Sequence, residues 1–318
     1  MPRPRSLWLL SGVVIGAVVA VVVVSAWPAT TAGTQPQRGP VAASTTDAPA
    51  VVVQTSVGSS TAAAPAPPVV PVVSVRAVVD ASERAIAPGM TLGVAVLDVS
   101  TGELVQGRYG TRPFMAASLS KLVLVVDMLD RRRTQGRAIA GSDLELVGRA
   151  LSSSDDGAMN VLWVRYDGPG AVGRVAARLG LAATRAPSDP TQWGDTLVTA
   201  GDLVRIYRHI LRDMAADDRN LIVDALSAAQ PTATDGFDQF FGLLRQGAST
   251  WVYAKQAWVP YRPSGFLLHS AGVVHDSRTG NDYAIALLSI QAHVSSQAAG
   301  DRLSTVAAAA LDAVEASG

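Results

Sequence analysis

The sequence predicts an α+β fold, in which an antiparallel sheet is flanked by helices and joined to a helical lobe. Apolar alternation over residues 91–98 near the start, and over 251–258, 265–274 and 282–291 near the end, predicts strands. The intervening stretch, from residues 142 to about 246, carries apolar residues at helical spacing almost throughout. No internal repeat is detectable. Strands from both ends of the folded region are therefore expected to form one sheet, with the helices between them forming the lobe.

The N-terminal part of the chain is predicted to lie outside that fold. Residues 7–27 contain no charged side chain and follow two arginines, a pattern long enough to cross a bilayer with the basic end in the cytoplasm. Residues 1–27 are accordingly predicted to be a transmembrane anchor or uncleaved signal, with the rest of the chain outside the cytoplasm, or secreted if the segment is cleaved. Residues 28–74 are rich in Pro, Ala, Thr, Val and Ser, which predicts a disordered linker. The folded domain is expected to span 75–318.

Each element of the domain can be placed by its pattern. A helix is expected over residues 75–87, a strand over 91–98 and, after a turn, a second strand that runs through Arg108. Small residues then lead into an apolar run at helical spacing, which predicts a helix that starts near Ser118. The three late strands follow the lobe, and an amphipathic helix is expected over 298–316. The helices predicted within the lobe span 143–151, 157–165, 171–179, 199–214 and 221–228.

Ser118 and Lys121 are the strongest candidates for chemistry. They stand three apart, one turn along the same helix face, which places an amine within reach of a hydroxyl. Serine becomes an effective nucleophile when a neighbouring base takes its proton, and a lysine with a lowered pKa can be that base. Of the 26 basic residues only Lys121 and Lys255 are lysines, although arginine serves wherever a solvated charge suffices. Lys121 is therefore predicted to be catalytic, whereas scarcity alone leaves catalytic and structural roles open for Lys255.

Composition excludes several other classes of function. The chain has no cysteine, which rules out a disulfide framework, thiolate metal sites and a lipidated cysteine within this sequence. Its formal net charge is zero and no basic stripe with interleaved aromatic residues occurs, so no nucleic-acid partner is predicted. No cofactor and no metal are predicted, because there is no Gly-rich phosphate loop and no histidine pair with ligand spacing on a helix. The histidines, which are expected to be structural, are His209, His269, His275 and His293.

Five short motifs occur in a fixed order along the domain. They are Ser118-Leu-Ser-Lys121, Ser154-Asp155-Asp156, Asp195 to Leu203, Lys255-Gln256-Ala257-Trp258 and His269 to Val274. In order and spacing they resemble the serine β-lactamase and penicillin-recognising enzyme family, closest to the class A type. The first resembles the S-x-x-K element, the second S-D-N, the third the segment after the Ω loop, and the last two the K-T-G strand and its successor. The resemblance covers roughly three quarters of the chain and implies a β-lactamase/transpeptidase-like fold in a divergent member.

The resemblance also implies a role for each catalytic candidate. Ser118 would attack an acyl carbon after Lys121 removes its proton, and Ser154 would relay a proton to the leaving nitrogen. Lys255 would offer its charge to a substrate carboxylate and, as a like charge, would lower the pKa of Lys121. The backbone N–H groups of Ser118 and Trp258 would form the oxyanion hole. The residues expected to bind substrate are Asp156, Gln256, Ala257 and Trp258.

Three departures from the family pattern bear on activity. Asp156 stands where the family has Asn, so a carboxylate replaces an amide that can donate a hydrogen bond. Gln256 and Ala257 replace the Thr and Gly of K-T-G, which removes a carboxylate-binding hydroxyl and adds a Cβ beside the substrate. No glutamate lies in the stretch where class A enzymes carry the Glu that activates the deacylating water. Asp189 is the nearest carboxylate that could substitute for it.

The sequence leaves functions from two different classes open. The first is an exported serine acyl-transfer hydrolase that acts on β-lactams or D-alanyl peptides through a Ser118 acyl-enzyme, with slow deacylation; cleavage of small esters is a variant of it. The second is a catalytically degenerate binding or scaffolding protein of the cell envelope that keeps the fold. Retention of the four catalytic candidates favours the enzyme, whereas Asp156, Gln256 and the missing glutamate favour its rival. The predicted partners are a small-molecule or peptidoglycan-peptide substrate and, through the N-terminal segment, the membrane.

Overall fold

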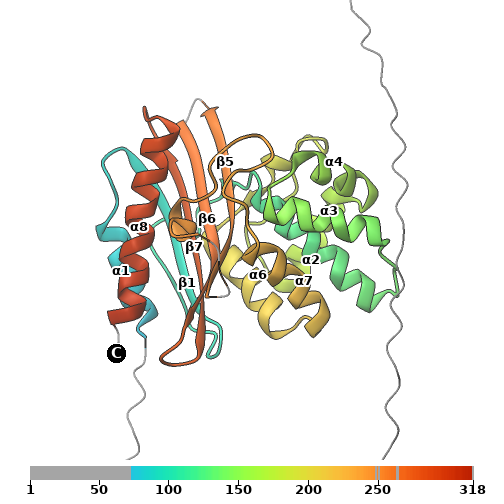
Figure 1. The fold of residues 1–318 in the computed structure, drawn as a ribbon, viewed down its shortest axis with the longest axis horizontal. Helices are drawn as coiled ribbons and strands as arrows, with labels where there is room; N and C mark the ends of the chain where they lie inside the picture. The colour runs from blue at the N-terminus through green and yellow to red at the C-terminus, as the bar shows by residue number, and fades with distance from the viewer. Residues whose placement is uncertain (1–72, 248, 250, 263–264, 317–318) are drawn as a thin grey trace, which may run out of the picture. The chain divides into compact units, whose positions relative to one another are not determined.

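An antiparallel sheet forms the centre of the domain in a computed structural model of the protein, which describes residues 73–247, 249, 251–262 and 265–316 (Figure 1). Its strands are β1 (Met90–Asp98), β2 (Leu104–Gln106), β5 (Val252–Arg262), β6 (Gly265–Asp276) and β7 (Asn281–Gln291). They lie in the order β2, β1, β7, β6, β5, and every neighbouring pair is antiparallel. Both ends of the described chain therefore contribute strands to one sheet.

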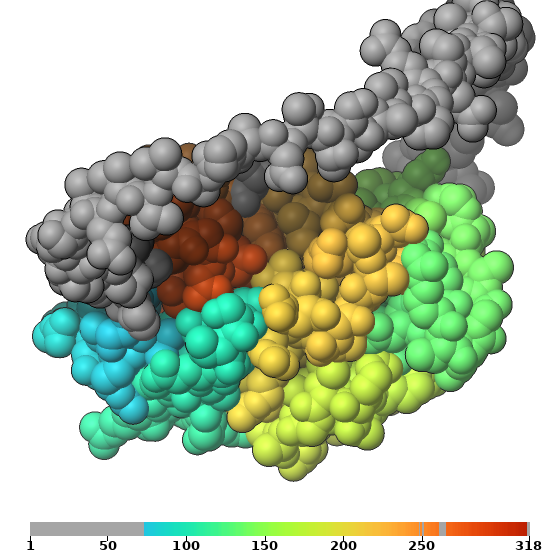
Figure 2. All heavy atoms as spheres, turned by 90° about the horizontal axis from the view of Figure 1, so that it is seen from below, coloured from blue at the N-terminus to red at the C-terminus, as the bar shows by residue number. Residues whose placement is uncertain are grey.

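Helices cover the two faces of the sheet in different ways. On one face lie α1 (Val75–Arg84) and α8 (Ser296–Ala316), which pack against each other and against the sheet (Figure 1). Each face has its own apolar core, because side chains of the strands alternate between two buried layers. Figure 2 shows the lobe (green to yellow) meeting the first and last parts of the domain (cyan, teal and red) along one face. The helices of this lobe are α2 (Leu119–Thr134), α3 (Gly141–Ser152), α4 (Asp156–Arg165), α5 (Gly168–Leu179), α6 (Ala200–Arg212) and α7 (Ala216–Ser227).

The structure confirms the predicted α+β fold and the order of its long elements. Two bounds differ in an instructive way. The opening helix ends at Arg84 and not at Ala87, because Pro88 disfavours the helical conformation in the residue before it. Strand β5 continues to Arg262, past its predicted end at Trp258, and so forms a long edge of the sheet beside β6.

A second, two-stranded sheet fixes the start of helix α2. It pairs β3 (Phe114–Met115) with β4 (Leu197–Val198), and sequence patterns missed it because two residues are too few to show a period. Next to it, the backbone N–H groups of Ala116 and Ala117 donate, at 2.7 and 2.9 Å, to carbonyl groups in the segment just before β4. The residues that lead into Ser118 are therefore held by a part of the chain far away in sequence.

Helix α2 is the central helix of the lobe. Its residues from Leu119 to Leu129 are all buried, and it packs on α3, α4 and α5. A helix surrounded in this way buries apolar side chains on all sides, which accounts for the apolar run from Leu122 to Val126. The same burial encloses Lys121, whose side chain is 0% exposed.

The predicted transmembrane anchor, residues 1–27, and nearly all of the predicted linker, residues 28–74, lie outside the described residues. Within the described part of the chain, no helix combines the length and the apolar character needed to cross a membrane. The described chain begins with Val73, which is 2% exposed, and with Ser74, whose side chain caps α1 by accepting from the N–H of Ala77. Packing against the domain therefore starts slightly before residue 75.

His269, on β6, is a buried histidine that links the sheet to the start of the lobe. Its Nδ1 accepts from the N–H of Ser289 at 3.1 Å, which leaves Nε2 to donate to the carbonyl of Met115 at 3.0 Å. Burial lowers the pKa of His269 to about 4, so the imidazole is neutral at pH 7. Its two bonds agree with the structural role expected of this histidine.

We expect His269→Gln to reduce the pH dependence of stability. Because folding lowers the pKa of this imidazole from 6.5 to about 4, its contribution is present above pH 6.5 and is lost as the pH falls below it. Between pH 7.5 and pH 5 the wild type should lose about 2 kcal/mol of unfolding free energy from this group alone. Urea unfolding of both proteins at both pH values measures the difference. An unchanged pH dependence in the variant would contradict the assignment.

Candidate active site

Ser118 lies at the N-terminal end of α2, where the chain enters the helix through an unusual backbone conformation. Ala117, just before it, has φ +46°, in the left-handed region that non-glycine residues rarely adopt. Ser118 occupies the N-cap position, but its side chain makes no capping hydrogen bond. Its Oγ is therefore available to other partners, and backbone strain of this kind is often found at functional sites.

Lys121 meets Ser118 one turn along the helix, as the spacing of the two residues predicts. Its Nζ donates to Ser118 Oγ at 2.8 Å and also lies 2.6 Å from Asp156 Oδ1. The carbonyl oxygen and Oγ of Ser154 are 2.7 and 3.1 Å away. Burial lowers the pKa of Lys121, while the carboxylate of Asp156 opposes this shift. Lys121 is thus a candidate base whose proton is partly retained by a neighbouring acid.

Ser154 bridges the two lysines from the turn between α3 and α4. It has φ +53°, its Oγ donates to Ser118 Oγ at 2.9 Å, and it accepts from Lys255 Nζ at 3.0 Å. The next residue holds this conformation, because Asp155 caps α4 with one carboxylate oxygen and accepts from Arg149 with the other. Ser154 thereby completes a chain of hydrogen bonds from Lys255 to Ser118.

Lys255, on β5, lies beneath the site. Its side chain is 0% exposed, and Nζ donates to Ser154 Oγ and to the carbonyl of Gln256, each at 3.0 Å. Burial, and then the charge of Lys121, hold the pKa of Lys255 well below its usual range. One expectation is corrected, because burial, and not the charge of Lys255, is the main cause of the lowered Lys121 pKa. The role of Lys255 toward a substrate carboxylate stays a prediction.

A cleft of about 240 Å³ opens above Ser118. The residues that line it include two aspartates, Asp156 and Asp235, and two tryptophans, Trp193 and Trp258. None of the described residues that line it is a lysine, an arginine or a histidine. The remaining lining residues are Ala117, Gly194, Val259 and Pro260.

Trp193 and Asp235 belong to this site, although sequence reasoning missed both. The ring centre of Trp193 lies 4.9 Å from Lys121 Nζ, and its Nε1 donates to Asn160 Oδ1 at 2.8 Å. Asp235 accepts from Trp258 Nε1 at 3.0 Å, and its charge acts on both buried lysines. Both residues come from segments without a periodic pattern. The one sequence signal is the glycine that follows each of them, which marks a turn able to present a side chain.

Gln256 and Ala257 lie near the cleft but do not form its wall. Side chains alternate along β5, so Ala257 faces the lobe, where it is 0% exposed, and Gln256 faces the opposite layer. Gln256 is 1% exposed, and its Nε2 donates to the carbonyls of Gln239, at 3.0 Å, and Phe241. Both side chains are thus engaged inside the protein, and the expectation that these residues bind substrate stays a prediction. Gln256 ties β5 to the loop that carries Asp235.

No glutamate is among the described residues that line the cleft, and Asp189 does not take its place. Asp189 is exposed, and its Oδ1 accepts from the N–H and the Oγ1 of Thr191 at 2.9 and 2.7 Å. The carboxylates that do line the cleft are Asp156 and Asp235, and each accepts a hydrogen bond from the protein. The site thus holds a nucleophile and a proton relay without a glutamate aimed at them.

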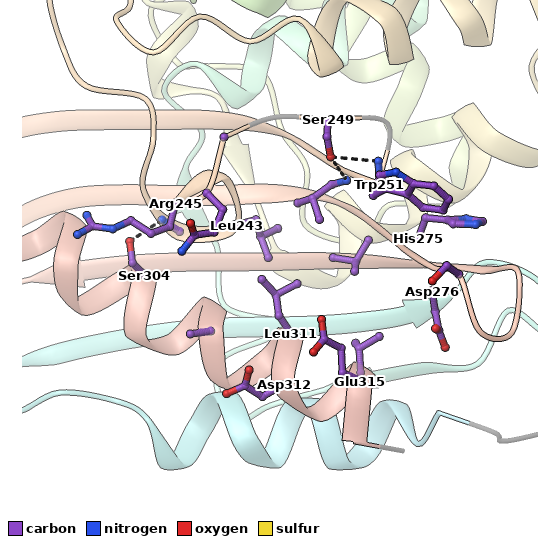
Figure 3. A pocket seen from close by; sticks show the side chains of 18 of the residues that line it. Leu243, Arg245, Ser249, Trp251, His275, Asp276, Ser304, Leu311, Asp312 and Glu315 are labelled. Atoms are coloured by element: carbon purple, nitrogen blue, oxygen red, sulfur yellow. Dashed lines mark hydrogen bonds between the residues drawn. The ribbon is translucent and has the colours of Figure 1, made fainter. Parts of the chain in front are cut away.

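A larger cavity, of about 840 Å³, lies between α8 and the 3₁₀ helix η2 (Gly242–Leu244) (Figure 3). Charged residues line it, among them Arg245, Asp312 and Glu315, but no lysine does. Its Ser249 accepts from two backbone N–H groups of the adjoining strand start. Within the described part of the chain, no three His, Cys, Asp or Glu side chains gather closely enough to hold a metal ion. The serine–lysine chemistry is therefore located at the smaller cleft.

Comparison with known proteins places the chain in a family. No family model matches the sequence. The "Putative lipoprotein LppW" of Mycobacterium tuberculosis is 34% identical over 214 residues, which cover 66% of this chain and 67% of that protein. The chain belongs to the LppW family. The protein of the same name from Mycobacterium bovis gives the same figures for this LppW-family chain.

Solved structures similar to this LppW-family protein are β-lactamases. The β-lactamase from Sphaerobacter thermophilus has a TM-score of 0.58 and 19% identity, and the match covers 76% of this chain and 97% of that one. A class A β-lactamase from Bacteroides cellulosilyticus has a TM-score of 0.62 and 16% identity, with 75% and 99% covered. The likeness shows the β-lactamase-like fold that the motifs predict. At these identities it shows the fold alone.

The pKa values of the two buried lysines can be measured directly. Labelling the side-chain Cε of lysine with ¹³C gives two signals in this LppW-family protein, because its only lysines are Lys121 and Lys255. We expect both to titrate below the ordinary lysine range, Lys255 furthest, because burial disfavours the ammonium. Asp156→Asn should lower the Lys121 pKa further by removing the opposing charge. Asp217→Asn should not, because Asp217 is exposed on α7 and pairs with Arg133. Titration of both signals in the ordinary lysine range would contradict the lowered pKa values of Lys121 and Lys255.

Proposed function

We propose that this protein is an exported serine acyl-transfer enzyme, which forms an acyl-enzyme on Ser118 and releases it slowly. The observation that carries the proposal is that Ser118 Oγ lies within hydrogen-bond distance of Lys121 Nζ (2.8 Å) and Ser154 Oγ (2.9 Å). Nucleophile, base and relay are therefore in mutual reach before any substrate binds. The β-lactamase-like fold of the solved neighbours supports the same reaction class by analogy.

Acylation follows from this geometry. Neutral Lys121 takes the proton of Ser118 as Oγ bonds to the acyl carbon, and the bond from that carbon to its leaving nitrogen or oxygen then breaks. The proton passes from Lys121 through Ser154 Oγ to the leaving atom, so the site returns to its starting charge. Backbone N–H groups of Ser118 and Trp258, both of which line the cleft, are the proposed donors to the oxyanion.

Deacylation lacks an equivalent base in this proposal. A water molecule that attacks the ester needs a group to take its proton, and Asp156 is paired with Lys121 at 2.6 Å. Asp235 accepts from Trp258 Nε1 at 3.0 Å. General-base assistance contributes about 10²- to 10⁴-fold, so its loss should make the acyl-enzyme persist.

One observation favours the rival function, a binding or scaffolding protein of the cell envelope. The contact of 2.6 Å between Lys121 Nζ and Asp156 Oδ1 stabilises the protonated amine, which cannot act as a base. β-Lactams and D-alanyl peptides are the substrates that the family resemblance suggests for the enzyme. Both carry a carboxylate near the reacting amide, which would approach the two acids of the cleft. We therefore base the proposal on the reaction class and test it first with a neutral ester.

We place this activity outside the cytoplasm, at the membrane. Support comes from the uncharged segment 7–27 behind two arginines and from the word lipoprotein in the name of the mycobacterial relatives. None of the 318 residues is a cysteine, so attachment of a lipid to a cysteine is excluded within this sequence. The apolar segment is accordingly the proposed anchor, and residues 28–72 the proposed linker.

The proposal predicts a stable adduct on Ser118. With p-nitrophenyl acetate, a small neutral ester, we expect a stoichiometric burst of nitrophenolate, slow turnover afterwards, and an acetyl group on the Ser118 peptide by mass spectrometry. Ser118→Ala should give no such adduct. Lys121→Arg keeps the positive charge but cannot accept the proton, so it should slow the burst by at least about 10²-fold.

Controls separate the parts of this prediction. Ser153→Ala removes a hydroxyl beside the relay that bonds to the carbonyl of Arg149 and to Oγ1 of Thr234, and its burst should match the wild type. Thermal unfolding checks that each variant is folded. Fast steady-state hydrolysis would contradict the slow deacylation, whereas no Ser118 adduct with this ester or with a penicillin would favour the binding protein.

A further inference from the structure

The cleft above Ser118 has the composition of a site for organic cations. Asp156 and Asp235 bring two carboxylates to it, and the indole ring of Trp193 lies 4.9 Å from Lys121 Nζ beside them. Carboxylates attract an ammonium group through charge, and aromatic faces attract it through their quadrupole. The described lining contains no lysine, arginine or histidine, and Lys121 behind it is already paired with Asp156, which leaves Asp235 as the carboxylate without a bonded cation among the described ion pairs.

The acidic and aromatic groups are held in place by their neighbours. Asp156 is anchored by Lys121 through one oxygen, and its side chain is 59% exposed, so its charge reaches the open cleft. Asp235 accepts from the N–H of Phe237 and from Trp258 Nε1, each at 3.0 Å. Trp258 stacks on Phe237, with ring centres 4.6 Å apart. A ligand would therefore meet preformed walls and would not have to order them.

The cations that could receive a carboxylate lie too deep to do so. Lys255 is 0% exposed, and its Nζ is bonded to Ser154 Oγ and to the carbonyl of Gln256. Lys121 is also 0% exposed and is paired with Asp156. A carboxylate that entered the cleft would lose water and meet two like charges with no cation free to pair with it.

We propose that the cleft selects acyl compounds that carry an ammonium group and rejects those that carry a carboxylate in its place. This inference rests on the proposed acyl transfer at Ser118 and names its substrate class. The ammonium would lie against Asp235, with the acyl carbon at Ser118 Oγ. The ring of Trp193 already accommodates a positive charge, because the Lys121 amine lies 4.9 Å from its centre. Asp235 is the specificity-determining residue.

Three p-nitrophenyl esters with acyl chains of matched length test this selection on the full chain. Their acyl groups are 4-(trimethylammonio)butyryl, the neutral isostere 5,5-dimethylhexanoyl, and the monoanion of glutaryl. We expect the Ser118 acylation rate to fall in that order, with the first and last differing by about tenfold or more at low salt and by less at high salt. The Ser118→Ala protein supplies the background for each ester.

Two variants assign the effect to Asp235. Asp235→Asn removes one wall charge and should bring the three rates closer together. Asp238→Asn makes the same charge change on the same loop outside the cleft lining, so it should keep the wild-type order. Acylation by all three esters without this order would overturn charge selection and leave acyl transfer at Ser118 intact.

A binding measurement keeps the inference testable without any reaction. We expect tetramethylammonium, but not acetate, to shift the indole N–H resonances of Trp193 and Trp258, and Asp235→Asn to weaken this response. Such shifts with no acylation by any ester would refute the proposed reaction and support the charge selection. An equal response to both ions, or none to either, would overturn the charge selection.

Discussion

The enclosure of two lysine amines between the lobe and the sheet is the constraint on which the rest of the site depends. Burying an ammonium costs several kcal/mol unless its donors find acceptors and an opposite charge. Lys121 and Lys255 share Ser154 as an acceptor, and Asp156 supplies the charge. To sit between them, Ser154 adopts a left-handed conformation, as does Ala117 at the entry to α2. The apolar packing around α2 thus sets both the lowered pKa values and the local backbone strain.

Strand β5 connects the chemistry of the site with the wall that faces a ligand. Its Lys255 points toward the lobe and holds Ser154, while its Gln256 points to the other layer and holds the carbonyls of Gln239 and Phe241. Those carbonyls belong to the loop that presents Asp235. The glutamine in the K-T-G position therefore has a structural task of its own. The alternation of side chains along β5 therefore positions Ser154 on one face of the sheet. On the other face it holds the loop that carries Asp235.

Spacing within single elements predicted the fold and the core of the site, because a helix or strand imposes its own period. The meeting of Ser118 with Lys121 follows from three residues of helix, and the sheet follows from the order of alternating segments. Trp193 and Asp235 could not be found in this way, since loops have no period and their positions depend on distant contacts. The direction of Gln256 was also missed, because both faces of β5 are buried and the sequence does not say which face bears the site.

Asp156 links recognition to chemistry, because one carboxylate faces both the base and the ligand. In the free site it favours the protonated form of Lys121, which restrains the nucleophile. A cationic ligand in the cleft would compete for the same carboxylate and add a like charge near Lys121, and both effects lower the pKa of that amine. An anionic ligand would do the opposite and favour the inactive, protonated base. Charge selection and activation of Ser118 would thus be coupled, so a carboxylate-bearing compound is disfavoured at binding and again at the proton transfer.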